Sequence, residues 1–164
     1  YTMSLSDMFL KIEGTRQGPI KGDSNVPGHI DEIDVTGWNW GMDVSAASFG
    51  NASARTTLQE LVIRKRVDRA STALMSALRA NEPLKKAILS VRKAGGEAPV
   101  DYLKITIEKA RVMSHHIGSA SDDKPEVVEE LRIAFFKVNV QYQPQTGTGG
   151  GGGATTFETE ITPA

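Results

Sequence analysis

The sequence predicts an antiparallel β-barrel, or a tightly curved β-sandwich, that carries one short helix. About six runs alternate apolar and polar residues with the period of two that is typical of strands. Three of these runs switch the parity of their apolar positions part-way, as a strand does where a sheet turns a corner. Since only one run has helical periodicity, nothing indicates a parallel sheet with crossover helices.

The strongest strand signal is Glu130–Tyr142, which is rich in β-branched and aromatic residues. From Leu131 to Phe135 the odd-numbered positions are apolar, whereas from Phe136 to Tyr142 the even-numbered ones are. The switch predicts a bulge or sharp bend at Phe135–Phe136, and it places Phe136 and Val138 in the core.

The other strands are shorter, and two of them contain the remaining parity switches. One switch lies at Gly37, where a bulge favours glycine, and the other near Lys109. Trp38 and Trp40 share a parity and are expected in the core. In chain order, the expected strands are Asp7–Glu13, Ile30–Trp40, Leu58–Val67, Lys86–Lys93, Tyr102–Met113 and, after Glu130–Tyr142, a short edge strand within Thr155–Thr162.

The helix is expected over Ser71–Ala80, where Leu74, Met75 and Leu78 form one apolar stripe. The hydroxyl of Ser71 or Thr72 is expected to cap its first turn, and Asn81 and Pro83 are expected to end it. Three stretches without periodicity are expected to be loops: Gly14–Gly28, Gly41–Thr57 and the polar stretch Ser114–Pro125.

Length and composition indicate a single domain, residues 1–164, with its core over 7–145 and a glycine-rich linker and tail over 146–164. The net charge of −1 gives no general drive toward nucleic acid or an anionic membrane. The absence of cysteine excludes disulfides and thiolate metal sites. No apolar run has membrane-spanning length, and the first residues lack the basic and apolar segments of a Sec signal peptide.

Six segments, in this order and at this spacing, resemble the hemolysin-coregulated protein (Hcp) family, the tube subunit of the bacterial type VI secretion system. The resemblance covers roughly Asp7 to Gln145. Its segments are DMFLKIEG at Asp7–Gly14, HIDEIDVTGWNWG at His29–Gly41, VDRAS at Val67–Ser71, SVRKAGG at Ser90–Gly96, YLKITIEKARVMS at Tyr102–Ser114 and FFKVNVQYQPQ at Phe135–Gln145.

The resemblance implies a compact antiparallel β-barrel of two sheets with one short α-helix on its flank. It further implies hexameric rings that stack into a tube, which a contractile sheath expels from a Gram-negative bacterium with effectors in its lumen. The implied partners are other copies of the chain and the sheath, spike and effector proteins. The implied localisation is cytoplasmic before firing and extracellular afterwards.

Two segments are candidates for assembly contacts. Met42–Thr57 is long for a connection that a tight hairpin could make, and the corresponding Hcp loop reaches the adjacent subunit and ring face. Its candidate stacking residues are Ala46, Ala47, Ser48, Phe49, Gly50, Asn51 and Arg55. The candidate lumen or cargo contacts are Ser114, His115, His116 and Ser119, chosen for the unusual histidine pair.

Catalytic and metal chemistry is weakly indicated. His29 lies near Asp31, Glu32 and Asp34, which makes a metal site conceivable, but a polar strand end open to solvent is the simpler interpretation. His115 and His116 are adjacent, so they cannot chelate one ion together in an extended chain, and solvated loop histidines are expected.

No nucleophile, base and orienting group can be assembled, so we expect no enzyme activity and no cofactor. The acidic residues between Asp122 and Glu130 lack the sugar-stacking aromatic residues of a glycosidase cleft, and the glycine run lacks the Lys-Ser/Thr of a P-loop. Without the resemblance, the next candidates are a monomeric carbohydrate-binding β-sandwich and then a β-sandwich hydrolase. Native mass separates an assembling subunit from both of these.

Overall fold

The structure is a computed structural model that describes residues 7–46, 50, 56–93, 100–144 and 153–161. Its elements are β1 (Met8–Gly14), β2 (Gly18–Ile20), β3 (Ile33–Asn39), β4 (Met42–Asp43), β5 (Thr57–Leu58), β6 (Leu61–Arg66), α1 (Ala70–Arg79), β7 (Leu84–Arg92), β8 (Asp101–Ser121), β9 (Lys124–Tyr142) and β10 (Thr155–Glu160).

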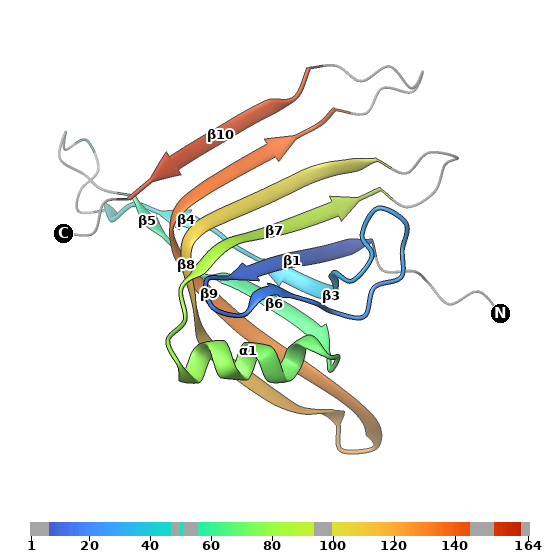
Figure 1. Cartoon of the computed structure of the whole chain (residues 1–164). Coiled ribbons are helices and arrows are strands. Elements are labelled where there is room, and N and C mark those ends of the chain that lie inside the picture. The colour runs from blue at the N-terminus through green and yellow to red at the C-terminus, as the bar shows by residue number, and fades with distance from the viewer. Residues whose placement is uncertain (1–6, 47–49, 51–55, 94–99, 145–152, 162–164) are drawn as a thin grey trace.

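Six antiparallel strands close into a barrel, and α1 lies on its flank (Figure 1). The strand order is β9-β6-β3-β1-β7-β8, and β8 pairs back to β9 to complete the circle. β2 extends the sheet beside β1, β10 extends it beside β9, and β4 and β5 form a separate two-stranded ladder. The predicted barrel with one flanking helix is confirmed.

The two longest strands bend where their apolar parity switches. Ile105 and Ile107 face the core in the first part of β8, and Ala110 and Val112 do so after Lys109. Lys109 has a positive φ of 53°, an uncommon conformation for a residue with a side chain, and it marks the corner. The register from β8 to β9 is unchanged across this point, so the switch is a bend that both strands share, without an inserted residue.

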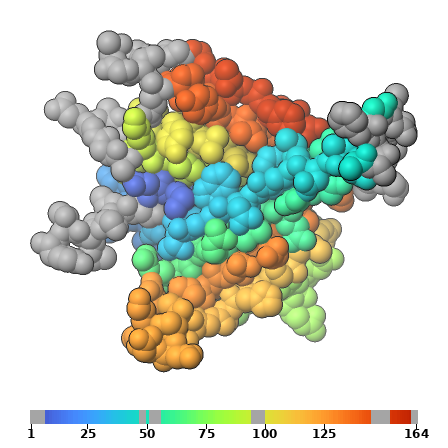
Figure 2. All heavy atoms as spheres, turned by 180° about the vertical axis from the view of Figure 1, so that it is seen from behind, coloured from blue at the N-terminus to red at the C-terminus, as the bar shows by residue number. Residues whose placement is uncertain are grey.

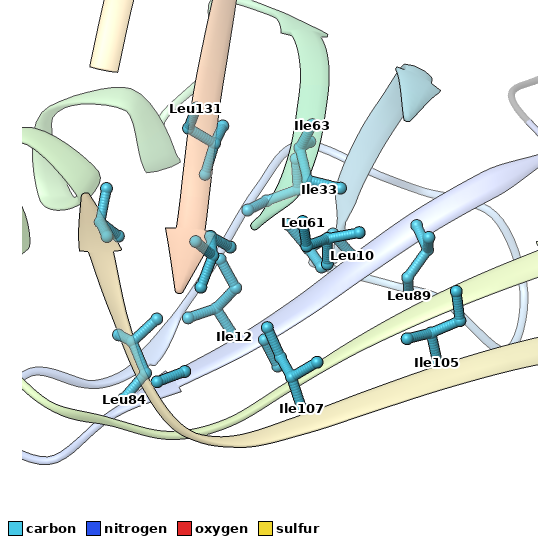
Figure 3. Packing of buried hydrophobic residues seen from close by; sticks show 14 of the residues in the cluster. Leu10, Ile12, Ile33, Leu61, Ile63, Leu84, Leu89, Ile105, Ile107 and Leu131 are labelled. Carbon is cyan, nitrogen blue, oxygen red and sulfur yellow. The ribbon is translucent and has the colours of Figure 1, made fainter. Parts of the chain in front are cut away.

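The core lies inside the barrel and receives side chains from every wall strand (Figure 3). Leu10 and Ile12 of β1 meet Ile63 of β6 and Ile107 of β8, and all four are almost completely buried. Because β-branched and leucine side chains fill the interior, burial of apolar surface supplies the main drive to close the sheet.

The predicted bulge at Gly37 is confirmed, since the register between β3 and β6 shifts between Val35 and Gly37. The helix ends as expected: Asn81 adopts a left-handed φ of 52° directly after the last turn. Its start differs from the prediction, because Asp68 accepts a hydrogen bond from Ala70 N–H at 3.0 Å, and Ser71 accepts one from Asp68 N–H at 3.0 Å. Over the described residues, no helix is long and apolar enough to span a bilayer.

The prediction of a polar loop over Ser114–Pro125 is wrong. β8 continues to Ser121 and β9 begins at Lys124, so the two strands form a long hairpin. From Ser114 to Val128, which we call the arm, β8 and β9 pair with each other through the backbone while most side chains are solvated. Strands without a buried face lose the alternation on which a sequence-based prediction depends.

Smaller differences concern the other predicted loops. β2 pairs with β1 inside the expected loop Gly14–Gly28, and the β4–β5 ladder lies at the ends of the stretch expected to be unstructured from Gly41 to Thr57. The expected strand Leu58–Val67 is interrupted at Gln59 and Glu60. The edge strand at Thr155–Glu160 is confirmed as β10, which pairs antiparallel with the last part of β9.

The predicted core position of Phe136 is wrong, since its side chain is 42% exposed, whereas Val138 is completely buried as expected. At the bend the neighbouring Phe135 points into the barrel and is buried, so Phe136 faces outward. Trp38 and Trp40 are only half-buried and pack against the edge of the core. The Trp40 indole N–H donates to the Gln59 carbonyl at 2.8 Å, which explains why its ring stays at the edge.

Candidate functional site

A buried ionic cluster joins β6, β9, α1 and the base of the arm. Lys65 of β6 and Glu129 of β9 are register partners, and both side chains are completely buried and ion-paired. The ammonium of Lys65 also lies 2.8 Å from Asp68 Oδ1 and donates to Ser71 Oγ at 3.2 Å. We refer to Lys65, Asp68, Ser71, His115 and Glu129 as the Lys65 cluster.

Glu129 accepts bonds from three directions. Beside the Lys65 contact, Ser71 Oγ donates to Glu129 Oε2 at 2.7 Å, and His115 Nε2 lies 2.7 Å from Glu129 Oε1. Burial alone would raise the pKa of Glu129, but hydrogen bonds from Lys65, Ser71 and His115 hold that pKa below its ordinary value. The carboxylate is therefore kept charged in a place where an unpaired charge would be costly.

The arm begins at this cluster and extends beyond the barrel. Figure 2 shows the β8–β9 hairpin, in gold and orange, as a separate lobe at one corner of the molecule. The imidazole of His115 faces back to Glu129 and has 5% of its side chain exposed, whereas His116 and Ser119 are exposed on the arm. Met113 and Ile117 add exposed apolar side chains to the same hairpin.

The loop between β4 and β5 starts and ends at the β4–β5 ladder, which lies away from the arm at another corner of the molecule (Figures 1 and 2). Its base is closed by the pairing of Met42 with Leu58 and by a bond from Gln59 N–H to the Gly41 carbonyl at 3.0 Å. Within the loop, Ala46 is exposed, and Gly50 adopts a left-handed φ of 80° that suits glycine. Ala47, Ser48, Phe49, Asn51 and Arg55 lie outside the described residues.

Comparison with known proteins identifies this architecture. A family model for the type VI secretion system effector Hcp matches residues 9–142. The chain belongs to the Hcp family. Protein hcp1 of Pseudomonas aeruginosa is 36% identical over 143 residues, which are 85% of this chain and 84% of that protein.

Solved structures agree with the family match. A type VI secretion system effector from Yersinia pestis has a TM-score of 0.73 at 25% identity, over 94% of this chain and 100% of that one. Hcp1 from Salmonella typhimurium also has a TM-score of 0.73, at 26% identity, over 94% of this chain and 98% of that one. β10 of this Hcp chain lies beyond the residues that the family model matches.

The expectation that His29 lies at a solvent-exposed strand end is wrong. His29 is 7% exposed, stacks on Phe9 and lies 3.0 Å from a carboxylate at each ring nitrogen, Glu32 Oε1 and Asp101 Oδ1. His115 is likewise buried against Glu129, so only His116 fits the expectation of a solvated histidine. Among the described residues, no group of His, Cys, Asp and Glu side chains could hold a metal ion.

The Lys65 cluster was missed in the sequence, although the sequence carries a signal for it. Lys65 occupies the apolar parity of its strand, in step with Leu61 and Ile63, and Glu129 occupies the parity of Leu131 and Ile133. Opposite charges at core positions of two strands are what a buried ion pair requires. The sequence does not show that these two strands are neighbours, and that pairing decides the contact.

We expect Lys65→Met to lower the free energy of unfolding by about 3–5 kcal/mol, because it leaves Glu129 buried without its cation. Urea denaturation at a fixed protein concentration measures this loss. Arg66→Met is the matched control, since the neighbouring Arg66–Glu126 pair is exposed and should change stability by less than about 1 kcal/mol. The double variant Lys65→Met/Glu129→Leu should recover part of the loss, and equal losses in Lys65→Met and Arg66→Met would contradict the prediction.

The cluster also predicts a contribution to acid denaturation. The folded-state pKa of Glu129 is lower than its ordinary value of 4.5, so the unfolded chain binds this proton more readily. The stabilisation is therefore complete above that ordinary value and is lost as the pH falls through the lowered folded-state pKa. In Glu129→Gln this part of the pH dependence of the unfolding free energy should be absent. If the unfolding free energy of the variant falls with decreasing pH as steeply as that of the wild type, Glu129 does not make this contribution.

Proposed function

We propose that this chain is a structural tube subunit of a type VI secretion system. Six copies close a ring, rings stack into a tube, and the expelled tube carries effectors in its lumen. The observation that carries the proposal is the Hcp family match over residues 9–142. The proposed partners are other copies of the chain and the sheath, spike and effector proteins, and the proposed route leads from the cytoplasm to the outside.

An open part of the core face supports self-association. The face of β9 that buries Val138 completely continues to Tyr142, which is 46% exposed. Phe157 of β10 is the register partner of Val140, so it lies on this same face, and it is 43% exposed. A sheet face that extends from the core into solvent with aromatic side chains is suited to burial against a partner, and we propose that a neighbouring copy covers it.

A contact of this kind is compatible with a closed ring. The open face lies on the β9–β10 edge, and the arm lies on a different part of the molecule (Figure 1). A contact between two different surfaces of identical subunits is heterologous, and it forms a ring when the rotation closes. We propose a structural role without catalysis, in which both buried histidines serve as contacts to carboxylates.

Ring stacking is assigned to the β4–β5 loop. Trp40, Gln59 and the β4–β5 ladder hold both ends of this loop, so the described residues at its base account for how it joins the barrel. Of the candidate residues Ala46, Ala47, Ser48, Phe49, Gly50, Asn51 and Arg55, most are small, one is aromatic and one carries a guanidinium. Small residues allow close backbone approach, and an aromatic or arginine side chain supplies an anchor.

The arm is assigned to lumen or cargo contact through Ser114, His115, His116 and Ser119. Their environments differ: His116 and Ser119 are exposed, His115 faces Glu129, and the Ser114 hydroxyl is buried. His116 and Ser119 can therefore meet a cargo protein without disturbing the Lys65 cluster.

The ring proposal is tested by placing a charge on the open face. We expect Phe157→Asp to shift the protein from hexamer to monomer in native mass spectrometry at micromolar concentration, because a buried unpaired carboxylate destabilises the interface. Thr156→Asp is the matched control, since it adds the same charge to the same strand on the opposite face. The same hexamer fraction in both variants, or a wild-type protein that is only monomeric, would refute the proposal.

The stacking role is tested by replacing Ala46–Ser53 with two glycines. We expect hexamers to persist, while tube formation and secretion fall sharply. A variant that replaces the same residues with a glycine-serine segment of equal length separates loss of side chains from loss of length. Normal secretion of the shortened protein would show that the loop has no part in stacking.

For the cargo contact, we expect His116→Ser to change which effectors co-purify with an intact ring. Ile117→Ser alters the opposite face of the same strand and serves as the control. Unchanged retention of every tested effector by the His116 variant would remove this assignment.

A further inference from the structure

The segment from Gly22 to Glu32 is folded back on itself and fixed to one end of the barrel. Its backbone is closed by bonds from Gly22 N–H to the Asp31 carbonyl at 2.8 Å and from Ser24 N–H to the Glu32 carbonyl at 3.0 Å. Val26 is buried, whereas Ile30 is 63% exposed. His29 is the buried side chain of this segment that contacts both β1 and β8.

The His29 ring makes three contacts, one through its face and one through each ring nitrogen. The ring stacks on Phe9 of β1 with centroids 4.2 Å apart and an interplanar angle of 5°. Nδ1 lies 3.0 Å from Glu32 Oε1 in its own segment, and Nε2 lies 3.0 Å from Asp101 Oδ1 at the start of β8. Arg92 of β7 lies on the same ring system, with its guanidinium carbon 5.7 Å from the centre of the Phe9 ring.

The number of protons on the His29 ring decides whether both of its carboxylate contacts are hydrogen bonds. A neutral imidazole has one N–H donor and one lone pair, whereas an ionised carboxylate only accepts hydrogen bonds. With a carboxylate at each nitrogen, a neutral ring would turn one lone pair toward another at 3.0 Å. While both carboxylates are ionised, both contacts are hydrogen bonds only when both ring nitrogens carry protons. His115 differs, because the carboxylate contact that it makes is through Nε2 alone, which a neutral tautomer satisfies.

We propose that His29 is a proton-dependent latch, in which the doubly protonated ring holds the segment Gly22–Glu32 on the barrel between Phe9 and Asp101. The latched state binds one more proton than the open state. It is therefore favoured at lower pH and weakened as the pH rises. The latch is internal to one subunit and does not depend on ring assembly.

Opening would have defined structural consequences. Loss of the latch uncovers the face of Phe9 that the imidazole covers, and Phe9 is completely buried in the latched structure. It also releases Ile30, the most exposed large apolar side chain among the described residues, from a fixed position at this end of the barrel. The segment remains tethered by Arg69, which donates to the Gly22 carbonyl at 2.6 Å and pairs with Asp31.

The experiment uses the full chain with ¹⁵N-labelled histidine, because only three histidines need to be assigned. Nitrogen correlation spectra across the pH range report whether both His29 nitrogens are protonated. Hydrogen exchange of Gly22–Glu32, normalised to the unfolded chain at each pH, reports whether the segment is closed. We expect protection to fall by on the order of tenfold or more as His29 loses its proton, from two charge-assisted hydrogen bonds. A neutral His29 ring with a fully protected segment would overturn the proposal.

Two variants separate the latch from a merely structural histidine. Asp101→Asn gives Nε2 a neutral partner that can donate or accept, so the segment should stay closed and lose its pH dependence. His29→Gln removes the titrating group and should give lower, pH-independent protection. His116→Gln alters an exposed histidine outside this segment and should leave the hydrogen exchange of Gly22–Glu32 and its pH dependence unchanged. Retained pH dependence in Asp101→Asn would overturn the proposal even if His29→Gln failed to fold.

Discussion

The buried pair of Lys65 and Glu129 is the contact on which the arrangement of the other parts depends. Two fully buried charges are stable only when each is paired and hydrogen-bonded. Here the remaining bonds come from Ser71 at the start of α1 and from His115 at the base of the arm. A helix or an arm placed differently would leave a buried charge with too few partners. The pair therefore specifies where the helix packs and where the arm leaves the barrel.

The bend at Lys109 lets two long strands serve two purposes. The part of β9 that precedes the bend in the sequence pairs with β6 and completes the barrel. The part that follows the bend pairs with β10. β8 follows the same bend, so the two strands stay in register while their apolar faces exchange. As a result the barrel is closed by the same strands whose core face continues outward to Tyr142 and Phe157. The surface proposed for ring contacts is thus a direct continuation of the core.

The arm and the segment Gly22–Glu32 are each joined to the barrel by a histidine that contacts a carboxylate. His115 joins the arm to Glu129, and His29 joins the segment Gly22–Glu32 to Asp101. The difference between them is chemical: one contact is satisfied by a neutral ring, and the other requires a second proton. Histidine–carboxylate contacts thus hold these two segments, whereas apolar packing supplies most of the barrel interior.

Periodicity in the sequence determined the parts of the fold that have one buried face. It predicted the barrel strands, the parity switches at Gly37 and near Lys109, the helix end at Asn81 and the edge strand β10, because burial of alternate residues leaves a pattern. Segment order and spacing indicated the Hcp family, which the family match confirms. The arm was missed because its strands bury neither face, and Phe136 was misplaced because the bend turns it outward.

The tertiary structure alone decided the partners of the buried polar residues. Lys65 and Glu129 are 64 positions apart, and His29 and Asp101 are 72 apart. Their charges and parities are visible in the sequence, but which strands become neighbours depends on closure of the whole sheet. Local patterns report whether a residue is buried, whereas the partner of a buried charge is set by contacts that exist only once the barrel has closed.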